Sequence, residues 1–244
     1  MAQGATHRPL LTSLSDRLLD LVFPPRCVSC NAFGAFICSG CQATMTAAGG
    51  ARCPTCWMPR RAGGARESAH PCGRCRHTAP AFNAVRAVYV YEGPARDAVH
   101  ALKYRGVSAV AREMASSMAT ALQAWSPLVT VVMPVPIAGH RRRLRGYNQT
   151  ELLAAEVARD SRLPLVRRAL RKRLSTAPQV QQSDEEARRR NVAGSFNCRG
   201  RPPAGGVLLI DDVITTGATL DACARVLLNA GSGPVFALTF ARED

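Results

Sequence analysis

Residues 207–219 read Val207-Leu-Leu-Ile-Asp-Asp-Val-Ile-Thr-Thr-Gly-Ala-Thr219. The stretch begins with an apolar strand that has no polar interruption, as is typical of a strand buried on both faces of a parallel sheet. Two adjacent carboxylates, Asp211 and Asp212, end this predicted strand, and a short loop leads into a helix expected over residues 220–230. Open α/β sheets bind their ligands at the carboxyl ends of parallel strands. We therefore expect a ligand site at this point of the chain.

The loop after the two carboxylates has the chemistry of a phosphate site. Backbone N–H groups of such a loop and of the following helix attract anions, and a glycine at 217 lets the backbone approach closely. Carboxylates bind a sugar diol or a divalent cation instead. A ribose 5-phosphate that carries a Mg²⁺-bound diphosphate combines all three features. In the weaker alternative the stretch binds no ligand. Asp212 is then only a residue at the start of the helix, and the hydroxyls of Thr215, Thr216 and Thr219 only cap its N-terminus.

The chain from residue 82 onward alternates predicted strands with predicted helices. This order is typical of a doubly wound parallel sheet. Strands are expected over residues 84–91, 128–133, 206–210 and 235–240, and helices over residues 94–104, 107–123, 149–161 and 220–230.

Eight of the ten cysteines precede residue 76 and form four C-x-x-C pairs, which is the ligand spacing of zinc knuckles. Pairing neighbours in sequence gives two Cys₄ sites. A cross-braced pairing needs a more complex chain path, and redox or iron–sulfur roles are weaker alternatives. His70 or His77 could replace one ligand. Four thiolates fill a zinc site completely, so both sites are expected to be structural. The predicted ligands are Cys27, Cys30, Cys38 and Cys41 at the first site and Cys53, Cys56, Cys72 and Cys75 at the second.

Composition and charge narrow the class of protein. The 244 residues carry 32 Lys and Arg against 17 Asp and Glu, a formal charge of +15, and residues 138–201 hold 16 of these cations against six acids. Such a surface suits polyanionic ligands. The sequence has no apolar run long enough to span a membrane, and because no long apolar segment with a cleavage site follows Arg8, we do not expect a secretory signal. We therefore expect a cytoplasmic protein without membrane insertion, in which clustered thiols bind metal.

Residues 207–219 resemble the 5-phosphoribosyl 1-diphosphate (PRPP) binding motif of type I phosphoribosyltransferases. Other stretches resemble the ComF/GntX competence-related family, and the cysteine segment is similar to that family's double zinc ribbon. The resemblance covers the chain from Cys27 to its end. The stretches are Pro134-Val-Pro136 with Arg141-Arg-Arg-Leu-Arg-Gly-Tyr-Asn-Gln149, Ala101-Leu-Lys-Tyr-Arg-Gly106, and Thr176-Ala-Pro-Gln179 with Arg188-Arg-Arg-Asn-Val192.

The resemblance implies the fold class and the site residues. It implies a type I phosphoribosyltransferase-like doubly wound parallel sheet, preceded by a small zinc-ribbon domain. It also implies that PRPP binds with Mg²⁺ and that residues 165–191 form a mobile hood over the site. The ribose hydroxyls would contact Asp211 and Asp212, the 5-phosphate would contact Thr215, Thr216, Gly217, Ala218 and Thr219, and the diphosphate would face Val135 and Pro136. Arg141, Arg145 and Lys103 are the cations available to stabilise the leaving diphosphate.

Two classes of function follow from these patterns. The first is a phosphoribosyltransferase that acts on an unidentified acceptor and is associated with DNA uptake. The second is a competence protein that binds PRPP or single-stranded DNA without turnover, together with proteins of the competence machinery. The expected domains are an N-terminal helix over residues 1–23, the double zinc ribbon over residues 24–80 and the phosphoribosyltransferase-like domain over residues 81–244. The oligomeric state is left open.

Overall fold

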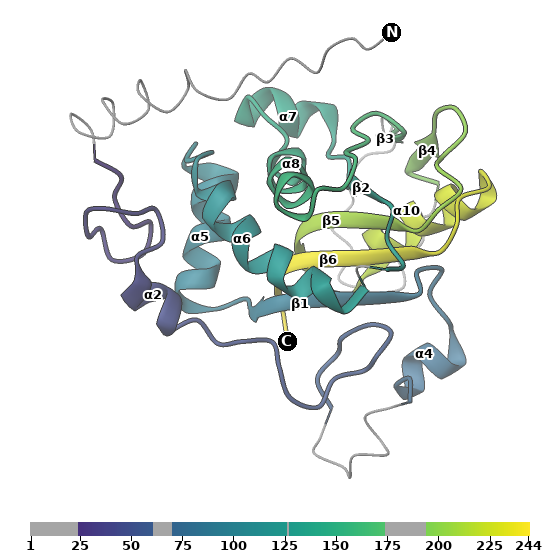
Figure 1. Ribbon diagram of the computed structural model, residues 1–244, viewed down its shortest axis with the longest axis horizontal. Helices are drawn as coiled ribbons and strands as arrows, with labels where there is room; N and C mark the ends of the chain where they lie inside the picture. The colour runs from purple at the N-terminus through teal and green to yellow at the C-terminus, as the bar shows by residue number, and fades with distance from the viewer. Residues whose placement is uncertain (1–23, 61–69, 126, 174–193) are drawn as a thin grey trace, which may run out of the picture.

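The structure is a computed structural model, which describes residues 24–60, 70–125, 127–173 and 194–244 (Figure 1). Its main feature is a four-stranded parallel sheet with the strand order β1-β6-β5-β2. The strands are β1 (Ala84–Val90), β2 (Val131–Pro134), β5 (Val207–Ile214) and β6 (Val235–Arg242). The predicted parallel sheet is thus confirmed, with the apolar strands β5 and β6 at its centre.

Helices cover both faces of the sheet because side chains alternate along each strand. On β5, Leu208 and Ile210 join the core under α5, α6 and α8. Val207 and Leu209 join the opposite core under α10. Figure 1 shows the first three helices together on one side. Their bounds are Gly93–Tyr104 for α5, Val110–Leu122 for α6, followed by the 3₁₀ turn η1 (Gln123–Trp125), Gln149–Ser161 for α8 and Ala218–Asn229 for α10.

Strand β5 is longer than the sequence predicts. The carboxylates were expected to end the strand, but β5 continues through them to Ile214. The extension pairs with β6 alone, because pairing with β2 stops at Ile210 and pairing with β6 continues to Ile214. Asp211 and Asp212 therefore lie where β5 has lost one of its two neighbours.

Several short elements were not predicted. They are α7 (Gly139–Arg145), the antiparallel pair β3 (Leu170–Lys172) and β4 (Phe196–Cys198), and α2 (Ser39–Ala43) and α4 (Gly73–His77) in the cysteine segment. Helix α7 buries no residue and ends at Gly146, whose φ of 78° is in the left-handed region. The β3–β4 pair covers the same face of the sheet as α10, through Leu170 and Phe196.

The segment between the two halves of the cysteine region lies along the outer edge of β1. The N–H of Ala48 donates to the carbonyl of Val88 at 2.8 Å, and the N–H of Val90 donates to the carbonyl of Thr46 at 2.8 Å. Ala47 and Tyr89 form the antiparallel bridge between these bonds. This segment therefore covers an edge of the sheet that would otherwise be free.

The predicted N-terminal helix over residues 1–23 lies outside the described residues, as do residues 176–179 and 188–192 and most of the expected hood. The three domain ranges stay predictions. Within the described part of the chain, no helix has the length and apolar character needed to cross a membrane.

Candidate functional site

The acidic pair is the centre of the candidate site. Asp212 is 3% exposed and Asp211 is half-buried. The N–H of Asp212 donates to Oδ1 of Asp211 at 2.9 Å, which orients the first carboxylate. Val135, just after β2, donates its N–H to the carbonyl of Ile210 at 3.0 Å. The Oγ1 of Thr150 donates to the carbonyl of Val135 at 2.5 Å, so the predicted diphosphate turn is fastened beside the carboxylates.

Lys103 approaches the acidic pair from the end of α5. Its Nζ lies 2.8 Å from Oδ1 of Asp212, and both side chains are largely buried. The other oxygen, Oδ2 of Asp212, is buried without a hydrogen-bond partner among the described residues. A buried carboxylate oxygen of this kind fits a hard divalent cation such as Mg²⁺, or a sugar hydroxyl. The sequence predicts Lys103 as a cation for the diphosphate, whereas the structure pairs it with a carboxylate.

Burial and charge shift the ionisation of this group of side chains. Burial, together with the neighbouring carboxylate of Asp212, raises the pKa of Asp211 to about 7 although Lys103 opposes the shift. Burial alone would lower the pKa of Lys103, but attraction to Asp212 outweighs it and raises that pKa. Near neutral pH the site therefore holds a charged lysine and one carboxyl that is only partly ionised.

The predicted phosphate loop follows directly. Residues 215–217 connect β5 to α10, and Gly217 at the helix N-cap has a φ of 80°, which favours glycine. The Oγ1 of Thr216 accepts a hydrogen bond from the N–H of Ala218 at 3.3 Å. Asp211 and residues 213–220 line one small cavity of about 40 Å³. The structure thus brings the loop and the first carboxylate to a common cavity.

A larger cavity of about 470 Å³ lies between α5 and α7. The predicted cations Arg141, Arg145 and Lys103 all line it, and Lys103 connects it to Asp212. Sequence reasoning missed Tyr104, which is 68% exposed and lies under the guanidinium of Arg145 at 5.2 Å from the ring centroid. The structure therefore brings the predicted catalytic cations together near the acidic pair and adds an aromatic surface.

Sequence reasoning also missed Lys172 on β3. Burial and the nearby charge of Arg141 lower the pKa of Lys172, and Asp211 opposes this shift. Lys172 also lies over the ring of Phe196, 5.4 Å from the centroid. The β3–β4 pair therefore brings a further cation toward Asp211, from the face of the sheet opposite Lys103.

The cysteines form the two predicted groups, with neighbouring pairs together. Within each group the Sγ atoms all lie within 4.8 Å of one another. The Sγ atoms of Cys30 and Cys38 are 3.6 Å apart, and those of Cys56 and Cys72 are 3.7 Å apart. Tetrahedral zinc with Zn–S bonds of about 2.3 Å requires sulfur atoms about 3.8 Å apart. Both groups therefore fit Zn²⁺, and the sequential pairing is confirmed.

The two zinc ribbons repeat the same local structure. The residue after each first knuckle, Asn31 or Trp57, has a φ near 60°. Backbone N–H groups point at ligand sulfur, from Cys38 to Cys27 at 3.5 Å and from Cys72 to Cys53 at 3.2 Å. Burial would raise the pKa values of these two thiols, but the N–H donors outweigh it and lower them to about 6 for Cys27 and about 7 for Cys53. These N–H donors thus favour the thiolate at the first ligand of each ribbon, whereas burial and neighbouring cysteines raise the pKa values of Cys41, Cys56 and Cys75.

Comparisons with known proteins agree with this architecture. The family model for the double zinc ribbon domain matches residues 18–76. The DNA utilization protein YhgH of Escherichia coli K12 is 30% identical over 209 residues, which are 82% of this chain and 87% of that protein. Competence protein ComFC of Bacillus subtilis is 28% identical over 204 residues, 80% of this chain and 79% of that protein. The chain belongs to the ComF/GntX family.

Solved structures of phosphoribosyltransferases align with part of this ComF/GntX chain at low sequence identity. The purine phosphoribosyltransferase of Pyrococcus horikoshii aligns with 54% of this chain and 81% of its own, at 13% identity and a TM-score of 0.34. The orotate phosphoribosyltransferase of Aeropyrum pernix aligns with 59% of this chain and 62% of its own, at 21% identity and a TM-score of 0.32. The parallel sheet, the two Cys₄ groups and the family together confirm the predicted fold class.

Proposed function

We propose that this ComF/GntX chain binds PRPP with Mg²⁺ and transfers its phosphoribosyl group to an acceptor in a process of DNA uptake. The observation that supports the proposal is the cavity that Asp211 shares with residues 213–220, which include the loop 215–217. A carboxylate and an anion-binding loop on one cavity, with Asp212 next to that carboxylate in sequence, suit a phosphorylated sugar better than a simple anion. The names of the relatives, competence and DNA utilization proteins, support the process.

In this proposal each part of the site has one role. The loop residues Thr215, Thr216, Gly217, Ala218 and Thr219 bind the 5-phosphate, and Asp211 and Asp212 bind the ribose hydroxyls. Lys103 positions Asp212 through its 2.8 Å ion pair. Val135 and Pro136 face the diphosphate, and Arg141 and Arg145 offer positive charge to it from α7. When bound, Mg²⁺ would neutralise part of the diphosphate charge, and Asp212, whose buried Oδ2 has no hydrogen-bond partner among the described residues, is the side chain that would hold it.

The transfer itself needs no protein nucleophile. The bond between the anomeric carbon and the diphosphate oxygen breaks, and its electron pair leaves with the diphosphate. A lone pair of the acceptor forms the new bond to the anomeric carbon, and the acceptor gives up a proton. The transition state resembles an oxocarbenium ion, so positioning and electrostatics carry the catalysis. Exclusion of water protects the cationic carbon from hydrolysis.

Calorimetric titration with PRPP and Mg²⁺ tests binding separately from transfer. We expect one PRPP per chain, a requirement for Mg²⁺ and a higher melting temperature at saturation. Ribose 5-phosphate lacks the diphosphate and should bind more weakly, because it leaves α7 without a partner. Diphosphate release with candidate bases and amines then tests transfer. PRPP that gives no heat of binding and no thermal shift would contradict the proposal. Binding of PRPP without release of diphosphate would support the binding site and contradict the transfer reaction.

Single-stranded DNA binding is a second candidate function. The surface that favours it combines the exposed arginines of α7 with the exposed ring of Tyr104 beside them. Proteins that bind single strands combine such cationic grooves with aromatic rings on which bases stack. The cations of α7 would face DNA phosphate and the diphosphate of PRPP alike, so the two ligands should compete.

A fluorescence titration with a labelled single strand at several salt concentrations tests this candidate. Replacing Arg141, Arg142 and Arg143 by Ala should weaken binding and reduce the salt slope by about 0.7 for each DNA phosphate that the variant no longer neutralises. The matched control replaces the exposed Arg112, Arg199 and Arg201 by Ala, which changes the net charge equally. Equal losses in both variants would show only a general charge effect. No binding at low salt would dismiss the candidate.

A further inference from the structure

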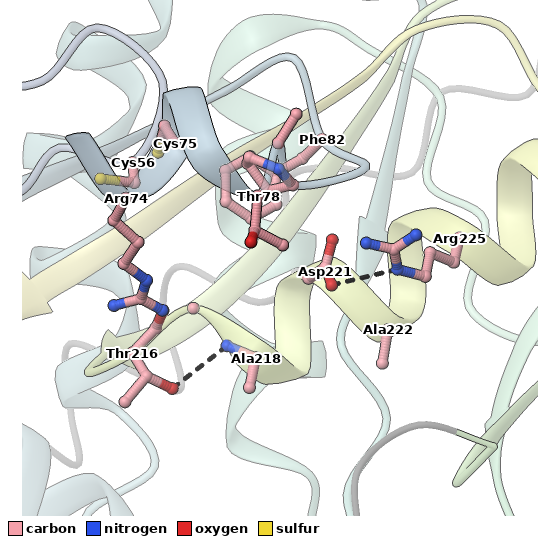
Figure 2. A pocket seen from close by; sticks show the side chains of 13 residues that line it. Cys56, Arg74, Cys75, Thr78, Phe82, Thr216, Ala218, Asp221, Ala222 and Arg225 are labelled. Atoms are coloured by element: carbon pink, nitrogen blue, oxygen red, sulfur yellow. Dashed lines mark hydrogen bonds and ion pairs between the residues drawn. The ribbon is translucent and has the colours of Figure 1, made fainter. Parts of the chain in front are cut away.

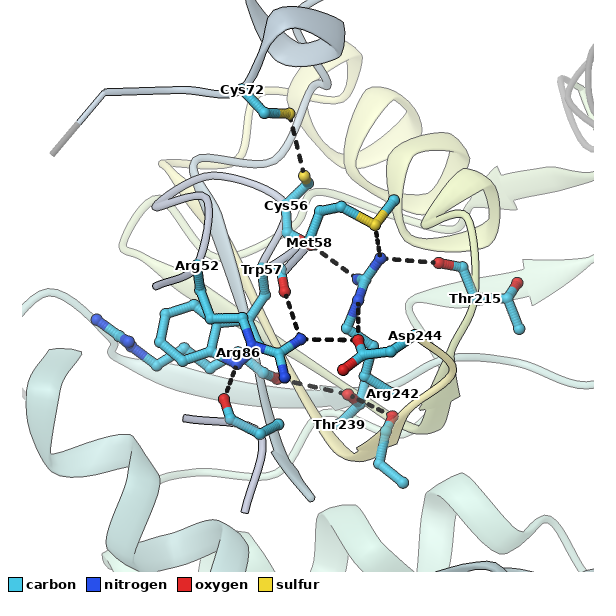
Figure 3. Close-up of polar contacts among 12 residues, drawn as sticks. Arg52, Cys56, Trp57, Met58, Cys72, Arg86, Thr215, Thr239, Arg242 and Asp244 are labelled. Atoms are coloured by element: carbon cyan, nitrogen blue, oxygen red, sulfur yellow. Dashed lines mark hydrogen bonds and ion pairs between the residues drawn. The ribbon is translucent and has the colours of Figure 1, made fainter. Parts of the chain in front are cut away.

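A buried arginine connects the second zinc site to the phosphate loop. Arg242, at the end of β6, is 1% exposed. Its Nη1 donates to the carbonyl of Cys56 at 2.9 Å, and its Nη2 donates to the carbonyl of Thr215 at 3.4 Å. Figure 3 shows this guanidinium between the two carbonyls, next to the carboxylate of Asp244. The Nε atom lies 3.2 Å from Oδ1 of Asp244, which also pairs with Arg52 of the ribbon at 2.7 Å.

A second arginine makes the same connection from the other knuckle. Arg74 precedes the zinc ligand Cys75 in α4, and its Nη2 donates to the carbonyl of Thr216 at 2.7 Å. In Figure 2 its side chain extends from α4 to the loop. Two consecutive loop carbonyls are thus held by guanidinium groups associated with one zinc site. Fixing these carbonyls also fixes the orientation of the peptide units whose N–H groups would meet a phosphate.

The contact between the second ribbon and the loop depends on these side chains. A cavity of about 290 Å³ lies between them, lined by Cys56 and Cys75 on one side and by residues 216–218 on the other. The facing backbones are therefore not joined there by a packed apolar interface. Helix α4 has only five residues, too few to be stable without tertiary support. Its N-cap Cys72 and its own Cys75 belong to the metal site, which therefore supports the position of α4 and of Arg74.

The first zinc site packs against a different part of the molecule. The Nη1 of Arg105 donates to the carbonyl of Val28 at 2.9 Å, and the Oγ of Ser29 donates to Oδ2 of Asp97 at 2.7 Å. The carboxylate of Glu113 accepts the N–H of Phe36 at 3.0 Å. These contacts lie on α5 and α6 and not on the phosphate loop. The two similar metal sites therefore provide a matched comparison.

We infer that the second zinc site positions the phosphate loop through Arg242 and Arg74, so that zinc at this site and a phosphorylated ligand at the loop stabilise each other. The identity of that ligand rests on the proposed function. The coupling itself concerns only the conformation of the loop. Both arginines are positioning residues, since they hold loop carbonyls and do not line the cavity of the acidic pair. By linkage, PRPP–Mg²⁺ should raise the affinity of the second site for zinc, as measured by equilibrium competition with a chelator.

Matched cysteine variants test the coupling. Cys72→Ser removes a ligand of the second site, and Cys38→Ser removes the equivalent ligand of the first. Hydrogen exchange of the amides of residues 215–219, zinc content and PRPP–Mg²⁺ affinity are measured for each. In Cys72→Ser we expect loss of one zinc ion, with exchange about tenfold faster and affinity about tenfold weaker, the scale of one charge-assisted hydrogen bond. In Cys38→Ser the same loss of zinc should leave the loop unchanged.

A second pair of variants keeps both metal sites intact. Arg74→Ala removes the bond to Thr216 without removing a zinc ligand, and Arg76→Ala removes an exposed arginine of the same helix. Only Arg74→Ala should speed exchange in the loop, with two zinc ions still bound. Unchanged loop exchange in zinc-loaded, folded Arg74→Ala would overturn the inference, as would equal effects of Cys72→Ser and Cys38→Ser. A wild-type chain that binds no PRPP would refute the proposed function, while the exchange measurements would still decide the coupling.

Discussion

The double variant Asp211→Asn, Asp212→Asn should lose PRPP–Mg²⁺ binding while its fold stays intact. The amides keep the shape of the carboxylates but not the charge that attracts Mg²⁺ and accepts the ribose hydroxyls. Charged hydrogen bonds contribute about 1.5–3 kcal/mol each, so removing two should weaken binding by about a hundredfold or more. Calorimetry measures the loss. Asp160→Asn, on the surface of α8 away from the site, is the control for a change of charge.

The pH dependence of stability checks the same site without ligand. The pKa of Asp211 is raised from its ordinary value of 3.8 to about 7, so the folded chain holds this proton more tightly than the unfolded chain. This group therefore makes stability fall as pH rises from about 4 to about 7. Asp211→Asn removes this pH-dependent loss of stability, and its amide oxygen can still accept the hydrogen bond from the N–H of Asp212. Its free energy of unfolding should exceed that of wild type at pH 8, with a smaller difference at pH 5. An equal difference at both pH values would contradict the raised pKa.

Purified without chelator, the chain should contain two zinc ions, and Cys38→Ser should contain one. Structural zinc contributes about 10–16 kcal/mol to the folding of small zinc modules, far more than one ribbon can recover from its few buried side chains. The first ribbon should therefore unfold locally in Cys38→Ser, while the sheet and its helices remain folded. Elemental analysis and circular dichroism measure the two effects. Cys198→Ser, outside both clusters, should keep both ions, and wild-type protein with no zinc and eight free thiols would refute the assignment.

Periodicity predicted the elements with long apolar patterns. Helix α8 has the predicted bounds, and β1, α5 and β6 differ by one or two residues at an end. These segments bury one face or both, so the spacing of their apolar residues indicates which side chains are buried. Spacing alone also predicted the Cys₄ groups, because a knuckle fixes two ligands within four residues.

The elements that were missed lack such a pattern. Helix α7 has no apolar stripe, and its leucine, Leu144, is 85% exposed. Strands β3 and β4 have three residues each, too few for a period to be recognised. The extension of β5 was missed because two carboxylates are unfavourable in a strand, yet pairing with β6 continues through them.

Two site features depend on contacts between distant segments. The ion pair of Lys103 with Asp212 joins α5 to β5, and nothing in either stretch of sequence specifies it. Arg242 follows an apolar strand near the end of the sequence, where an arginine ordinarily lies in solvent. The burial of Arg242 could be recognised only from the three-dimensional structure, in which the second zinc ribbon folds over it.

The segment at residues 46–48 has a consequence for how the chain can be divided. It belongs to the cysteine region in sequence, yet its antiparallel bridge and two backbone hydrogen bonds cover the outer edge of β1. A fragment that began near residue 81 would expose the backbone N–H and C=O groups of β1 to other molecules, which promotes edge-to-edge aggregation. The cysteine region thus covers an edge that the parallel sheet would otherwise expose, and the two parts form one unit at this edge even though both Cys₄ groups found among the described residues lie in the cysteine region.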